Sequence, residues 1–155
     1  LREYVKLNKG FVLGICNGFQ ILCETRLLPG VLIENTKTKF ISEDCALFFN
    51  NKEITIPIAH KEGCFWADED TIKQIEKNDM VILRYKNNPN GSINNIAGLY
   101  DSKHHVIGMM PHPERAVLSQ CGLADGKKIF EFLKTELLNF KKSCPTKNLS
   151  KKRVE

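Results

Sequence analysis

Short apolar runs alternate with segments of helical periodicity along most of the chain. The runs at residues 11–15 (FVLGI) and 105–110 (HVIGMM) are typical of strands buried on both faces of a sheet. Apolar residues at helical spacing predict amphipathic helices over 17–27 and 125–140, and residues 67–78 (ADEDTIKQIEKN) predict a third helix with an acidic cap.

The middle of the chain has the composition of β-strands. Residues 45–49 (CALFF) and 53–59 (EITIPIA) flank an Asn-Asn-Lys turn and predict a β-hairpin. Residues 80–85 (MVILRY) and 95–100 (NIAGLY) predict two further strands around the loop at 86–92 (KNNPNGS). We therefore predict an α/β fold of three layers, in which helices cover both faces of a mostly parallel sheet and the hairpin is an addition to that sheet.

The 155 residues suffice for one compact domain, which we place at residues 1–140. The net charge of +5 belongs to residues 141–155, because removing their six basic residues and one acid from the totals of 23 and 18 leaves 17 of each. We expect this segment to be a basic, disordered tail. It contains no aromatic residue for base stacking, so we expect no nucleic-acid partner.

The chain shows no apolar run of the roughly 18 residues that a membrane span needs, so we expect no membrane partner and a cytoplasmic protein. The cysteines and histidines show no Cys-x-x-Cys pair and no helical His-x-x-x-His pair. We therefore expect free thiols in a reducing compartment and no metal site.

Residues 14–18 (GICNG) lie where the first apolar run meets a helix. Gly-x-Cys-x-Gly at such a junction has the layout of a nucleophile elbow with cysteine in place of serine. The positive end of the helix would lower the pKa of the Cys16 thiol, and the backbone N–H of Asn17 would be placed to donate to an oxyanion. A small buried hydrophobe beside a tight turn has the same pattern, so the motif alone leaves both interpretations open.

Residues 109–116 (MMPHPERA) supply a base just past the second apolar run. His112 and Glu114 are two residues apart in a segment that its prolines keep extended, so their side chains leave on the same side. His-Pro-Glu alone is also an ordinary turn. Both motifs lie at the carboxyl ends of predicted parallel strands, where α/β folds place active sites, so we expect Cys16, His112 and Glu114 to meet as nucleophile, proton carrier and orienting carboxylate.

Several stretches resemble the class I (triad) glutamine amidotransferases, and among them the glutaminase subunits of phosphoribosylformylglycinamidine synthases. They are GICNGFQIL, LLPG, PIAHKEG, RYKNNPNGSINNIAG and GMMPHPERA, which span most of residues 11–117. The resemblance implies a flavodoxin-like fold and hydrolysis of glutamine to supply ammonia for purine (IMP) biosynthesis. It implies no cofactor in this chain, because ATP and magnesium are used by the large synthetase subunit. That subunit and a small accessory subunit are the expected partners.

The resemblance also implies roles for individual residues. Cys16 would form a glutamyl thioester, His112 would act as general acid and base, and Glu114 would orient His112. Contacts with glutamine are implied for a further set of residues: Asn17, Gly18, Gln20, Asn90 and Ser92. Family members have an upstream strand-helix-strand portion with a glycine-rich loop that gives a second oxyanion N–H. This sequence starts after it, so we expect an N-terminally truncated domain with an open apolar sheet edge.

Alternatives remain at the level of single residues and of function. His60 in PIAHKEG is either a second base or a residue that fixes a loop by hydrogen bonds. Asn88, Asn90 and Ser92 are turn formers in the first place, although the resemblance places them beside glutamine. A γ-glutamyl hydrolase, a glutaminase of another synthase, and a non-catalytic binding subunit in which the elbow only supports the fold are the alternative functions.

Overall fold

The computed structural model describes residues 1–7, 10–118 and 122–143. In chain order its elements are α1 (Arg2–Lys6), β1 (Val12–Ile15), α2 (Asn17–Glu24), β2 (Val31–Ile33), β3 (Ile41–Phe49), β4 (Lys52–His60), β5 (Cys64–Trp66), α3 (Glu69–Lys77), β6 (Val81–Tyr85), η1 (Ile93–Asn95), β7 (Ile96–Asp101), β8 (Val106–Met109), η2 (Pro113–Arg115) and α4 (Gly126–Ser143). Cys121, Cys144 and most of the predicted tail at 141–155 lie outside the described residues.

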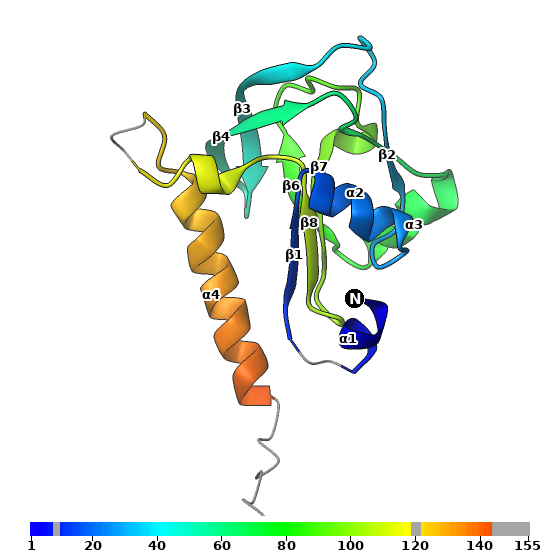
Figure 1. Cartoon of the computed structure of the whole chain (residues 1–155), viewed down its shortest axis with the longest axis vertical. Coiled ribbons are helices and arrows are strands. Elements are labelled where there is room, and N and C mark those ends of the chain that lie inside the picture. Colours follow the sequence, from blue (N-terminus) through cyan, green and yellow to red (C-terminus); the bar gives the residue numbers. More distant parts are fainter. Residues whose placement is uncertain (8–9, 119–121, 144–155) are drawn as a thin grey trace, which may run out of the picture.

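A six-stranded sheet in the order β1-β8-β7-β6-β3-β4 forms the centre of the fold, and β2 pairs with β5 in a separate ribbon. Helices α2 and α4 lie on opposite sides of β1 and β8 (Figure 1). The neighbours Val106 and Ile107 point to opposite faces of β8, Val106 into an apolar cluster with Phe19 of α2 and Ile107 into a second cluster with Ile129 of α4. The predicted α/β fold with three layers is therefore confirmed.

The prediction of a mostly parallel sheet was wrong. Among the described strands, β1 and β8 are the one parallel pair, whereas each other neighbouring pair in the six-stranded sheet is antiparallel. The reason lies in the connections between strands. Short turns join β3 to β4 and β7 to β8, and a short turn makes a pair antiparallel. Helix α3 connects β5 to β6, but β5 belongs to the separate ribbon, so this helix does not join two strands of the same sheet. An apolar run shows that a strand is buried but not the direction of its neighbours.

The β3–β4 hairpin was predicted correctly. Asn50 and Asn51 have φ angles of 48° and 60°, and the strands pair in continuous register from Phe49–Lys52 to Ile41–His60. Two central residues with positive φ make a type I′ turn, whose twist matches that of the strands, and asparagine tolerates this conformation better than most residues.

The two apolar runs differ in burial. All four residues of β8 are buried, as predicted. Strand β1 is an edge of the sheet in the described part of the chain, and Leu13 is 36% exposed, so the prediction of burial on both faces was wrong for β1. An edge strand has a neighbour on one side only, which leaves its side chains less covered than those of a central strand.

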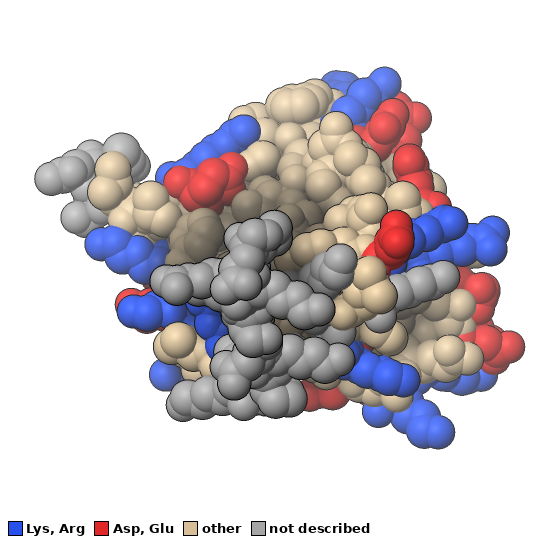
Figure 2. Space-filling model, turned by 60° about the horizontal axis from the view of Figure 1, so that its bottom comes forward, with Lys and Arg blue, Asp and Glu red and all other residues tan. Residues whose placement is uncertain are grey.

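Charges on the folded part are mixed. On the face shown in Figure 2, acidic and basic side chains lie interspersed and form no continuous basic patch. Among the described helices, none combines the length and the apolar character needed to cross a membrane.

The glycines of the elbow make different demands on the fold. A Cβ on Gly14 would lie 2.6 Å from the backbone carbonyl of Gly18 and 2.6 Å from a methyl group of Leu22, whereas a Cβ on Gly18 would meet nothing within 4 Å. The close approach of β1 to α2 therefore depends on Gly14.

We expect Gly14→Ala to lower the free energy of unfolding by about 1–3 kcal/mol, because the methyl group must push the first turn of α2 away from β1. Gly18→Ala is the matched control and should be neutral or stabilising by up to about 1 kcal/mol, since alanine favours a helix. Denaturant unfolding of both variants measures the difference. Equal effects would contradict the packing described here.

Candidate active site

Cys16 is held in a strained backbone conformation at the end of β1. Its φ and ψ angles are 52° and −107°, it is the N-cap residue of α2, and its backbone N–H donates to the carbonyl of Met109 at 2.8 Å. A cysteine with positive φ persists only where the surrounding structure fixes it, and such strain is frequent at functional sites. The local geometry is that of the strand-to-helix elbow predicted from GICNG.

The Cys16 thiol is half-buried and donates to the carbonyl of Ala59, with Sγ 3.7 Å from the oxygen. Burial raises the pKa of this thiol, while the Asn17 backbone N–H and the charge of Arg115 lower it and the charge of Glu114 raises it. The prediction that the helix end lowers the pKa of Cys16 was right about the contribution of the Asn17 N–H. It was wrong about the net shift, which is upward because burial is the larger effect. The resting thiol therefore keeps its proton and needs a base to become a nucleophile.

His112 is oriented as such a base requires. Its Nδ1 lies 2.6 Å from Oε1 of Glu114, and its side chain is 10% exposed. A carboxylate only accepts, so we assign the proton to Nδ1 and a lone pair to Nε2. That Nε2 is buried and has no hydrogen-bond partner in the described part of the chain.

The parallel pairing of β1 and β8 brings the two motifs together. Ile15 is in register with Met109, so Cys16 and the segment leading to His112 leave the same edge of the sheet side by side. The charges of Glu114 and Arg115 act on the Cys16 thiol, which places η2 close to the sulfur. No hydrogen bond joins Cys16 to His112 in the described residues, because the thiol donates to Ala59 instead.

The free edge of β4 anchors both motifs. Along an antiparallel edge strand, alternate residues direct their backbone groups away from the sheet. The N–H of Thr55 donates to the Asp125 carboxylate at 2.8 Å, the carbonyl of Pro57 accepts from the backbone N–H of His112 at 2.8 Å, and the carbonyl of Ala59 accepts from Cys16. Pro57 is tolerated here because it has no N–H to leave unpaired at the edge. These long-range contacts have no local pattern in the sequence that could predict them.

The residues predicted to bind glutamine have varied surroundings. Asn17 is exposed at the start of α2, next to Cys16, and Gly18 follows it. Gln20 donates from its side-chain amide to the carbonyl of Glu62 at 2.6 Å. Their contacts with glutamine stay a prediction.

Asn90 and Ser92 are buried and bonded within the protein. Asn90 Nδ2 donates to the carbonyl of Gly63 at 2.7 Å, and Ser92 Oγ accepts from the N–H of Phe65 at 2.9 Å. Asn88 Oδ1 accepts from the N–H of Gly91 at 2.8 Å, as expected of a turn former. Asn90 and Ser92 thus hold the loop after β4, and the prediction that they contact glutamine is not tested by these bonds.

His60 fixes a loop, the second of the two interpretations. Its Nδ1 lies 3.1 Å from Oδ1 of Asn35, which also accepts from the N–H of Gly63 at 3.1 Å. Asn35 is 1% exposed and was missed in the sequence, where a single asparagine in a polar stretch has no distinguishing pattern.

The other described thiols lie in less accessible places. Burial is the first cause that raises the pKa of Cys23 and that of Cys45 to about 12, and it also raises the pKa of Cys64. All three are free, as is Cys16. The described residues include no cluster of histidine, cysteine and acidic side chains suited to a metal ion.

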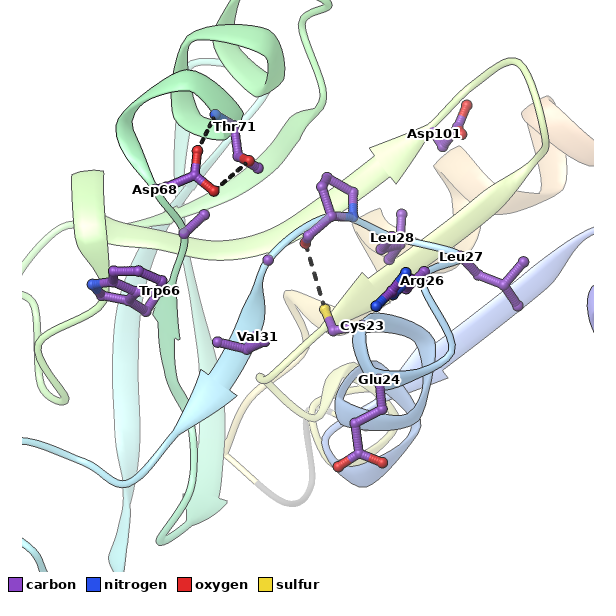
Figure 3. Close-up of a pocket in the computed structure, with 13 residues that line it drawn as sticks. Cys23, Glu24, Arg26, Leu27, Leu28, Val31, Trp66, Asp68, Thr71 and Asp101 are labelled. Carbon is purple, nitrogen blue, oxygen red and sulfur yellow. Dashed lines mark hydrogen bonds between the residues drawn. The ribbon is translucent and has the colours of Figure 1, made fainter.

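A cavity of about 600 Å³ lies elsewhere, between the end of α2, residues 27–31 and the start of α3 (Figure 3). Neither Cys16 nor His112 lines it. Two of its polar side chains have partners within the protein: Asp68 caps α3 through the N–H of Thr71 at 2.8 Å, and Cys23 donates to the carbonyl of Pro29 with a distance of 3.7 Å. The predicted nucleophile and base therefore lie at the sheet edge and not in this cavity.

Comparison with known proteins agrees with the resemblance found in the sequence. Residues 1–122 match the family described as the CobB/CobQ-like glutamine amidotransferase domain. A chain in the structure of PurLQS from Thermotoga maritima is 37% identical and superposes with a TM-score of 0.74. The match covers 90% of this chain and 65% of that chain, so this chain spans less than two thirds of the relative's length. This chain belongs to the CobB/CobQ-like glutamine amidotransferase family.

Proposed function

We propose that this chain is the glutaminase component of a phosphoribosylformylglycinamidine synthase. It hydrolyses glutamine to glutamate and passes ammonia to an ATP-dependent synthetase subunit in purine biosynthesis. The observation that carries the proposal is the position of Cys16, at a strained elbow, beside a His112 that Glu114 orients. Family membership and the 37% identity to a chain of PurLQS support the same function.

The first half of the reaction forms a thioester. His112 Nε2 takes the proton of the Cys16 thiol while Sγ bonds to the side-chain amide carbon of glutamine, and the carbonyl electron pair moves to oxygen. The backbone N–H of Asn17, which follows Cys16 at the start of α2, would donate to this oxyanion. The C–N bond then breaks, the proton on His112 passes to the nitrogen, and ammonia leaves.

The second half restores the enzyme. Water attacks the glutamyl thioester while His112 takes one of its protons, and the C–S bond breaks to release glutamate and return the proton to sulfur. Glu114 stabilises the positive charge that His112 carries in each half. Because burial raises the pKa of Cys16, the thiol depends on His112 for both proton transfers.

The remaining parts of the proposal concern partners. The large synthetase subunit would use the ATP and magnesium, and a small accessory subunit would complete the assembly. The cytoplasm is the expected compartment. The similarity to a chain of PurLQS supports an assembly with further subunits.

We expect Cys16→Ala in the natural full-length protein to lower glutamate release from glutamine by at least about a thousandfold, because no other group can form the thioester. The assay is run with and without the large synthetase subunit. Cys64→Ala is the control and should keep the wild-type rate. A Cys16→Ala protein as active as wild type would refute the assignment, and efficient turnover of γ-glutamyl peptides without a partner would favour a γ-glutamyl hydrolase.

We expect Glu114→Gln to lower kcat by roughly 10²- to 10⁴-fold with little change in KM, because an amide can neither enforce the Nδ1–H tautomer nor stabilise the imidazolium. Steady-state kinetics with glutamine measures the effect. Glu53→Gln is the matched control, because Glu53 is a carboxylate of β4 that forms an ion pair with Lys86. A kcat that stays at the wild-type value would remove Glu114 from the mechanism.

A further inference from the structure

His60 carries a buried nitrogen that the protein does not satisfy. The residue ends β4 and is 3% exposed, and its Nε2 has no hydrogen-bond partner among the described residues. Buried polar atoms in folded proteins are almost always bonded, and leaving one unsatisfied is destabilising. This nitrogen therefore points to a partner that the described residues do not supply.

The surrounding bonds define what that partner must be. The Nδ2 group of Asn35 donates to the carbonyls of Lys39 at 2.9 Å and His60 at 3.0 Å, and its Oδ1 accepts from the N–H of Gly63. The orientation of the amide is thereby fixed, so Oδ1 also accepts from His60 and the ring proton lies on Nδ1. Nε2 of His60 is left with a lone pair that requires a hydrogen-bond donor.

The ring is rigid as well as oriented. Gly63 packs against its Nδ1 side so closely that a Cβ at this position would collide with the ring. Asn35, which accepts the hydrogen bond from Nδ1 of His60, is itself buried. The acceptor is therefore presented in one fixed direction.

The position of His60 relates it to the nucleophile and the base. It directly follows Ala59, which accepts from the Cys16 thiol, and it is three residues from Pro57, which accepts from the backbone of His112. Burial, and then the positive charge of His112 in its protonated form, lowers the pKa of His60 to about 4, so the ring is neutral near pH 7 and lies within electrostatic reach of His112. Each of these two histidines presents a lone pair on Nε2 that has no partner among the described residues, and two lone pairs cannot bond to each other.

We propose that Nε2 of His60 accepts a hydrogen bond from the nitrogen of the substrate carboxamide. This inference rests on the proposed function. A primary amide nitrogen carries two N–H groups, and the ammonia formed from it carries three, so the nitrogen can donate to His60 before and after cleavage. His60 exchanges no proton: the C–N bond breaks, the transferred proton comes from His112, and His60 holds the released nitrogen as neutral ammonia.

The test compares two substrates with the same acyl group, glutamine and glutamate γ-methyl ester. The leaving oxygen of the ester has no hydrogen to donate, so His60 has nothing to accept from it. In the natural full-length protein we expect His60→Leu to lower kcat/KM for glutamine by about 10- to 100-fold and to leave kcat/KM for the ester within about twofold. His60→Gln, which can place an amide oxygen near the same point, should restore part of the loss.

Controls separate this inference from the proposed function. His105→Leu changes a histidine whose Nδ1 is also unpartnered but whose ring packs on Phe11, and it should affect neither substrate. Equal losses on both substrates in His60→Leu would assign His60 a structural role through Asn35, and no loss on either would also overturn the inference. Failure of the proposed function would appear differently, as hydrolysis of neither substrate by the wild type or of both by Cys16→Ala.

Discussion

The parallel pairing of β1 with β8 is the constraint on which the site depends. It sets Ile15 opposite Met109, so the chain leaves both strands at one edge of the sheet, toward Cys16 on one side and His112 on the other. The backbone bond from Cys16 to Met109 then fixes the elbow to the neighbouring strand. Sheet geometry thus brings together two residues that are nearly a hundred positions apart.

Strand β4 completes this arrangement from outside. Its carbonyls at Pro57 and Ala59 contact His112 and the Cys16 thiol, and His60 follows directly. Burial of the sulfur raises its pKa, which makes the thiol unreactive until a base acts on it. Burial therefore both protects the Cys16 thiol and makes its reactivity depend on His112.

Local signals in the sequence predicted local structure well. The structure confirms four features that were predicted from residues close together in the chain: the Asn-Asn turn, the Asp68 cap of α3, the burial of β8 and the His112–Glu114 pair. The predictions were wrong for strand direction, for the exposure of β1 and for the sign of the Cys16 pKa shift, because all three depend on segments distant in the sequence. Asn35 was missed for the same reason, since its partners are brought to it only by the fold.

Covalent labelling can show whether Cys16 is the nucleophile. The natural full-length protein is treated with a diazo-ketone analogue of glutamine, digested, and examined by peptide mass spectrometry. We expect one modified peptide, the one that contains Cys16, with labelling slowed by added glutamine. Modification of Cys23, Cys45 or Cys64 in its place, or labelling that glutamine does not slow, would contradict it.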